Sequence, residues 1–103
     1  MIHAFTVLAF TLLAVADAGE PCRDVVPPKD GYVPDAVTAI SIAVAVLTSL
    51  NGAAMVDREK PYTAQLDGDT WIVSGRPAPE MGGVAVVQIS KKDGSIKCVY
   101  HTL

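Results

Sequence analysis

The residues that could support catalysis lie near the end of this 103-residue sequence. Ser90 or Ser95, together with Asp93 and His101, are the residue types of a serine hydrolase, in which a histidine deprotonates the serine and a carboxylate orients the histidine. The sequence around them has neither a nucleophile elbow nor an oxyanion loop. We therefore expect no catalysis from this group and predict that the chain is not an enzyme.

Metal, phosphate and nucleic-acid chemistry have little support either. One histidine after the N-terminal segment and two distant cysteines lack the spacing of a zinc site. The glycines of residues 75–83 do not match a phosphate loop, because no Gly-Lys-Ser/Thr follows them. The formal net charge is −3, without the basic stripe of a nucleic-acid binder. We expect no cofactor, no metal and no nucleic-acid partner.

The first 18 residues have the pattern of a secretory signal peptide. Residues 1–16 contain no Asp, Glu, Lys or Arg, and small residues follow at 16–19. The apolar run 4–16 is too short to cross a bilayer of about 30 Å as a helix. An uncleaved anchor and a buried helix remain alternatives, since the segment lacks Lys and Arg. We predict cleavage near Ala18, a periplasmic protein and no stable membrane insertion afterwards.

Two cysteines would remain after cleavage, Cys22 and Cys98. In an oxidising compartment an even number of cysteines in a small domain favours a disulfide, here worth about 2–4 kcal/mol. Two unrelated thiols, with Cys98 buried as a small apolar residue, are the alternative. We predict the Cys22–Cys98 bridge.

A proline-rich arm at residues 19–34 is expected to lead into a domain at 35–103 that begins with a helix. Asp35 is the predicted N-cap, residues 36–50 the helix body and Asn51-Gly52 the stop. The buried stripe is predicted to comprise Ala36, Val37, Ile40, Ala43, Val44, Leu47 and Leu50. The opposite strip is uncharged and permits a homodimer or another partner chain; it consists of Thr38, Ser41, Ala45 and Thr48.

Four strands are predicted after the helix, at residues 62–66, 70–74, 83–90 and 95–102. The connections are turns at 67–69 and 91–94 and a Pro/Gly loop at 75–83, while the charged run 57–60 is expected to be a solvated loop. The fold class is therefore α+β, with one helix packed on a four-stranded antiparallel meander. In the last strand, alternation places Ile96, Cys98 and Tyr100 toward the helix and Lys97, Val99 and His101 on the outer face.

Five short motifs in order carry a resemblance over about residues 34–103. They are Val37-Thr38-Ala39-Ile40-Ser41-Ile42-Ala43, Lys60-Pro61-Tyr62, Trp71-Ile72-Val73-Ser74-Gly75, Gly82-Gly83-Val84-Ala85 and the segment Ile89 to Ile96. Together they resemble the nuclear-transport-factor-2-fold immunity proteins of bacterial polymorphic toxin systems. The resemblance implies a reduced cystatin-like cone of sheet around a helix. It also implies a cognate secreted toxin or effector as partner, neutralised by occlusion of its active site.

Toxin contact is expected from two loops and the outer sheet face, at Asp57, Arg58, Glu59, Arg76, Glu80, Met81, Gln88, Lys97 and His101. Structural roles are expected for Trp71, Gly75, Gly82, Gly83, Asp93 and Gly94.

Two alternatives stay open from the sequence. A peptidase-inhibitory domain of the PepSY type is also similar to a helix followed by strands, with a hairpin like residues 91–96. A small-ligand binder is the other, although the alanine-rich helix does not indicate a large cavity.

Overall fold

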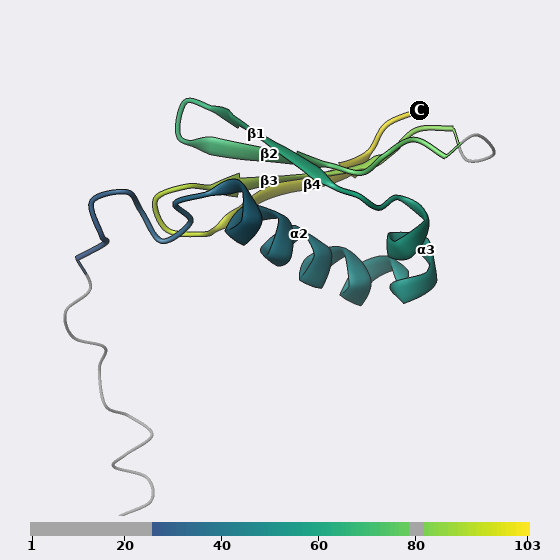
Figure 1. Cartoon of the computed structure of the whole chain (residues 1–103), viewed down its shortest axis with the longest axis horizontal. Helices are drawn as coiled ribbons and strands as arrows, with labels where there is room; N and C mark the ends of the chain where they lie inside the picture. Colours follow the sequence, from purple (N-terminus) through teal and green to yellow (C-terminus); the bar gives the residue numbers. More distant parts are fainter. Residues whose placement is uncertain (1–25, 79–81) are drawn as a thin grey trace, which may run out of the picture.

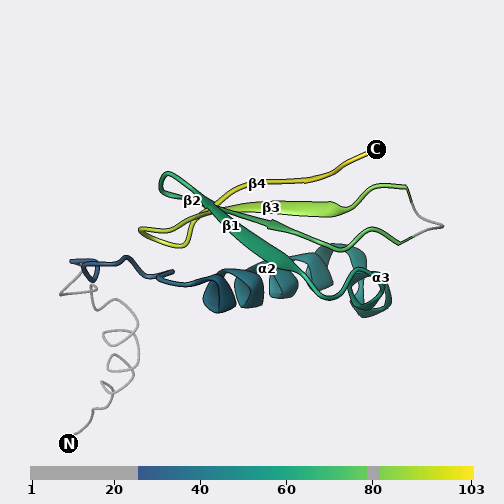
Figure 2. The same ribbon diagram turned by 45° about the horizontal axis from the view of Figure 1, so that its top comes forward.

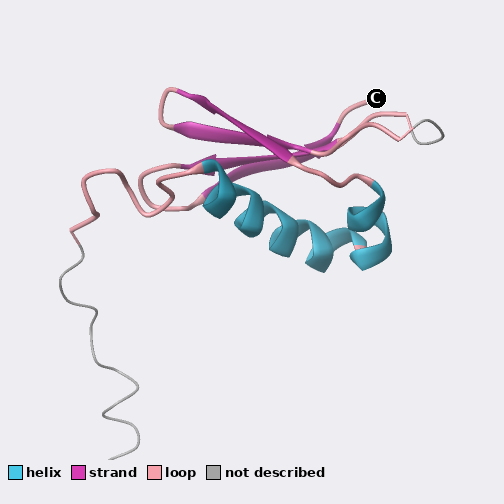
Figure 3. Ribbon diagram, viewed as in Figure 1, coloured by secondary structure: helices cyan, strands magenta, loops and turns pink. Residues whose placement is uncertain are grey.

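The computed structural model describes residues 26–78 and 82–103. One helical layer packs on a four-stranded antiparallel sheet of order β1-β2-β3-β4, which confirms the predicted α+β meander (Figures 1 and 3). The predicted leader, Cys22, Glu80 and Met81 lie outside the described residues. The elements are α2 (Ala36–Asn51), α3 (Ala53–Arg58), β1 (Thr63–Asp67), β2 (Thr70–Ser74), β3 (Ala85–Ser90) and β4 (Ile96–His101).

Helix α2 begins at the predicted residue and ends one residue beyond the predicted body, with the predicted Asp35 and Gly52 as its caps. Asp35 has an extended backbone, and its Oδ1 accepts hydrogen bonds from the Thr38 backbone N–H at 2.9 Å and the Thr38 hydroxyl at 2.7 Å. These bonds to the ionised form lower the pKa of the Asp35 carboxyl. At the other end Gly52 has a φ of 88° and donates its N–H to the Thr48 carbonyl. Capping at both ends therefore fixes the helix.

The predicted buried stripe of α2 is wrong in part. Ala39, Ala43 and Leu47 are the buried residues, whereas Val37 is 74% exposed and Leu50 62% exposed. The alanines lie against the sheet, where a small side chain lets the two layers approach closely, and the larger residues on either side are only partly covered. Two large apolar side chains are thus left on the surface of α2.

The buried residues of the sheet belong to its two central strands, β2 and β3. Helix α2 contacts β1, β2 and β3. Strand β4 is the edge strand farthest from the helix (Figure 2). Trp71 and Val73 of β2 are buried, as predicted, and β2 has the predicted bounds. The buried cluster between the layers comprises Val33, Ala39, Ala43, Leu47, Val56, Tyr62, Trp71, Val73, Ala85, Val87 and Ile89.

A bulge in β4 reverses the predicted faces of its second half. The pairing between β3 and β4 shifts by one residue between Gln88 and Ile89, so that no residue of β3 lies opposite Lys97. Residues opposite each other in an antiparallel pair share a face. Because Ala85 and Val87 face α2, their partners His101 and Val99 do too, while Cys98 and Tyr100 lie on the outer face. The register pairs are Ala85–His101, Val86–Tyr100, Val87–Val99, Gln88–Cys98 and Ile89–Ile96.

Residues 28–33, here called the strap, attach the start of the described chain to the β3–β4 turn. The backbone N–H groups of Tyr32 and Val33 donate to the carbonyls of Lys92 and Lys91 at 2.9 and 3.0 Å. Val33 is fully buried, and its carbonyl accepts from the Trp71 indole N–H at 2.8 Å. The end of the predicted arm is therefore part of the core.

Cys98 is exposed on β4 and forms no disulfide with any residue of 26–78 or 82–103. Its predicted partner Cys22 is not described, so the bridge stays a prediction. Within residues 26–78 and 82–103, no helix has the length and apolarity needed to cross a membrane.

Candidate functional site

The predicted contact residues lie in two places. Asp57 and Arg58 end α3, Arg76 follows β2, and His101 ends β4, all at the end of the sheet where α3 lies (Figure 1). The Arg76 backbone N–H and its Nε donate to the carbonyls of Glu59 and Lys60, both at 2.7 Å, which holds this loop against the end of α3. Gln88 and Lys97 are farther along the outer face, where the Lys97 ammonium donates to the Thr70 hydroxyl at 2.6 Å.

Glu59 is buried, so the prediction of a solvated loop at 57–60 is wrong at this residue. Only 3% of its side chain is exposed. Its Oε1 accepts the Ala85 backbone N–H at 2.8 Å, and its Oε2 lies 3.5 Å from His101 Nε2. Glu59 thus joins α3 to β3 and β4. The short helix α3 was not predicted, and it is what turns Glu59 inward.

The Glu59 carboxylate continues the hydrogen-bond ladder between β2 and β3. Beyond the last pair of that ladder, the Gly75 N–H still donates to the Ala85 carbonyl at 3.0 Å. The Ala85 N–H instead meets Glu59 Oε1. A Cβ at Gly75 would overlap that carboxylate, so glycine is needed here because of close approach rather than backbone angle. Its predicted structural role has a physical reason.

Tyr62 lies beneath this junction. Its hydroxyl donates to the Val56 carbonyl at 3.2 Å, and its ring is buried. Burial raises the pKa of Tyr62, and the negative charges of Glu59 and Asp57 raise it further. The neutral phenol is therefore the form that the fold stabilises.

The hydrolase group considered from the sequence is not assembled. Ser90 and Ser95 lie at the β3–β4 turn, where the Ser90 N–H donates to the Ser95 carbonyl. Asp93 accepts the Ser95 N–H at 2.9 Å, and this bond lowers the pKa of the Asp93 carboxyl. His101 is at the opposite end of β4, beside Glu59. The remaining residues of predicted structural role belong to turns or loops: Gly94 follows Asp93, and Gly82 and Gly83 precede β3.

A hollow of about 230 Å³ separates β4 from the C-terminal half of α2 and from α3. Leu50 and Val99 are exposed large apolar residues at its rim. Its lining contains no carboxylate and no lysine or arginine, and its titratable residues are Tyr100 and His101. We call it the β4 hollow; its lining residues are Leu47, Leu50, Asn51, Met55, Ala85, Val99, Tyr100 and His101.

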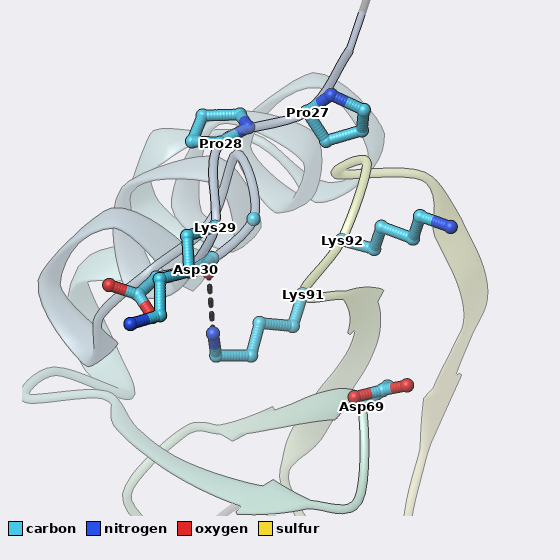
Figure 4. A pocket seen from close by; sticks show the side chains of 8 residues that line it. Pro27, Pro28, Lys29, Asp30, Asp69, Lys91 and Lys92 are labelled. Carbon is cyan, nitrogen blue, oxygen red and sulfur yellow. Dashed lines mark hydrogen bonds between the residues drawn. The ribbon is translucent and has the colours of Figure 1, made fainter.

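A second hollow of about 380 Å³ lies at the other end of the sheet, between the strap and the hairpin turns (Figure 4). Lysines and aspartates line it together, and the Lys91 ammonium donates to the Asp30 carbonyl across it. This hydrogen bond joins the strap to the β3–β4 turn, so the hollow lies at a contact between two parts of the same chain. In residues 26–78 and 82–103 no group of three His, Cys, Asp or Glu residues is placed to hold a metal ion.

Comparison with known proteins gives one family and one curated relative. The model of the NTF2 fold immunity protein family matches residues 38–103. The uncharacterized protein YbbC of Escherichia coli (strain K12) is 32% identical over 66 residues, which are 62% of this chain and 54% of YbbC. The chain thus spans about half the length of this relative. No solved structure gives a significant match.

Proposed function

Because this chain belongs to the NTF2 fold immunity protein family, we propose that it binds one cognate toxin protein and neutralises it by covering the toxin's active site. The observation that carries the proposal is the family match over residues 38–103, which begins within α2 and extends through β4. Immunity of this kind requires a specific protein–protein contact and no chemistry by the chain itself.

The end of the sheet near α3 is the surface that we propose for toxin contact. It combines exposed apolar side chains at the β4 hollow with exposed charged residues at the same end of the sheet, Asp57 and Arg76. An apolar centre with a polar rim is the usual anatomy of a protein interface. Glu59 is too buried to contact a partner directly, so its part is to position His101 and β3.

We also propose that the chain acts after export. The support is the charge-free segment 1–16 with its small-residue end, which is typical of a signal peptide. A toxin met outside the cytoplasm would attack the cell wall, lipid or the membrane. Cell fractionation with mass measurement of the mature chain tests this, and a full-length protein found in the cytoplasm would contradict it.

Co-expression tests the immunity function. Each gene adjacent to that of this chain is expressed in a host cell, with its product directed to the periplasm, with and without this protein. We expect one product to arrest growth and this chain to restore it, and we expect the purified pair to form a stable complex. If no neighbouring product is toxic, or if growth stays arrested with the chain present, the proposed function is wrong.

A further inference from the structure

Strand β4 is an edge strand, and helix α2 does not cover the face of β4 that points toward the helical layer. Helix α2 contacts the other three strands, and every residue of β4 is exposed. Ile96 and Val99, which face the helix side, are 40% and 37% exposed. A sheet edge with exposed apolar side chains is a template for pairing with another strand.

The register shows which backbone groups of β4 are free to pair. The Gly75 N–H donates to the Ala85 carbonyl, so the peptide groups of Ala85 point toward β2 and those of Val86 toward β4. Tyr100 and Cys98 are therefore the residues of β4 that bond to β3, through their pairs with Val86 and Gln88. By alternation the N–H and C=O of Val99 and His101 point to the open edge.

The β4 hollow lies directly beneath this edge. Val99 and His101, whose backbone groups point outward, also line the hollow with their side chains. A strand added beside β4 would send alternate side chains to the α2 side of the sheet. One apolar side chain of such a strand would enter the hollow and contact Leu50 and Met55.

The two edges of the sheet differ in charge. Apart from the thiol of Cys98 and the phenol of Tyr100, the ionisable side chains of β4 are those of Lys97 and His101. Strand β4 contains no carboxylate. The other edge, β1, carries Asp67 and no cation. A partner strand with acidic side chains would therefore be attracted to β4 and repelled at β1.

We propose that an extended segment of the toxin, with an apolar side chain between acidic ones, adds to the sheet as a fifth strand alongside β4. This inference rests on the proposed immunity function and names the mode of contact. Backbone hydrogen bonds would give affinity, and the hollow would give specificity. A second copy fits less well, because two β4 strands side by side bring together cations without any carboxylate.

The test uses the mature protein and a catalytically inactive form of the toxin found by co-expression. Val99→Pro removes the N–H that points to the open edge and keeps the bonds to β3, a position where an edge strand tolerates proline. Leu50→Lys puts a charge at the rim of the hollow. We expect each to weaken toxin binding by at least about tenfold. Hydrogen exchange should show the Val99 and His101 amides protected in the complex.

Matched controls separate docking from folding. Leu66→Pro removes an amide that points to the open edge of β1, and Val37→Lys charges an exposed apolar residue at the other end of α2. Both should keep wild-type affinity, and thermal unfolding should show that all four variants are folded. Val99→Ala keeps the amide and should bind more tightly than Val99→Pro.

Each other outcome overturns the inference. If the complex forms but Val99→Pro and Leu50→Lys bind as wild type, the contact lies elsewhere while the immunity function stands. If no neighbouring toxin binds, both proposals fall together. If the chain alone sediments as a dimer that Val99→Pro dissociates, the edge belongs to a second copy.

Discussion

The two ends of the sheet join distant parts of the chain in different ways. At the strap end, Tyr32 and Val33 meet the β3–β4 turn through backbone hydrogen bonds, and the Trp71 indole donates to the Val33 carbonyl. At the α3 end, one side chain, Glu59, connects α3 to β3 and β4. The first junction combines backbone bonds that any residue can make with one tryptophan side chain, and the second depends on a single carboxylate.

The contrast indicates where the molecule tolerates substitution. Lys91 and Lys92 take part in the strap through their carbonyls, which any residue supplies. Glu59 contributes through its carboxylate, which only glutamate can place at that distance from Ala85 and His101. At the α3 end, which borders the proposed toxin site, Glu59 is therefore the residue whose replacement the junction tolerates least.

The largest effect is expected from Trp71→Ala at the strap end. It opens a cavity in the core and removes the donor to the Val33 carbonyl, which should lower the free energy of unfolding by about 3–5 kcal/mol. Urea unfolding measures this. Trp71→Phe keeps much of the volume and should cost less. A smaller loss for Trp71→Ala than for Glu59→Ala would contradict the expectation that the buried indole contributes more to stability than the Glu59 carboxylate.

Glu59→Ala tests the α3 end. It leaves the buried Ala85 N–H without its acceptor, which should cost about 1–3 kcal/mol. Glu59→Gln retains an oxygen acceptor and should lose less. Hydrogen exchange at Ala85 should quicken in the alanine variant alone. Equal stability of both variants and the wild type would show that the junction does not depend on this side chain.

Comparing the stability of Gly31→Ala with that of Gly68→Ala measures the cost of the close approach between the strap and the Lys91 carbonyl. Both glycines have positive φ, 82° and 61°, so alanine at either position should cost about 1–2 kcal/mol. A Cβ at Gly31 would also collide with the Lys91 carbonyl, whereas Gly68 has open space. We expect Gly31→Ala to be the less stable of the two in thermal unfolding. Identical unfolding midpoints would mean that the strap can move away from the Lys91 carbonyl without loss of stability.

Tyr62→Phe should have the smallest effect at neutral pH, about 0.5–1.5 kcal/mol for the bond to Val56. The pKa of Tyr62 is raised in the folded state, so its contribution is present below its ordinary pKa of about 10 and is lost as the pH rises through the folded value. Stability of the wild type should therefore fall more steeply above pH 10 than that of Tyr62→Phe. Parallel alkaline curves would contradict this.

Much of the fold follows from local sequence signals. Asp35 and Gly52 mark the ends of α2, and the bounds of β2 follow from its run of strand-forming residues. The faces of β4 could not be predicted, because the bulge at Lys97 depends on pairing with β3 and leaves no sequence pattern of its own.

The site was only partly predictable. The sequence predicts Asp57, Arg58, Arg76 and His101 as contact residues, and the structure brings these four to one end of the sheet. The burial of Glu59 was missed because charged runs are usually solvated, although the glycine at 75 is a signal for close approach. The β4 hollow depends on which strands the helix covers, and alternation along one chain does not encode that.

The burial of Val33 sets a lower limit on the piece of sequence that can be transplanted. The segment shared with the family begins at residue 38, but a graft cut there would leave the Trp71 indole with no acceptor and a gap in the interior. A chimera or truncated expression clone must therefore start upstream of the strap, at or before Pro28.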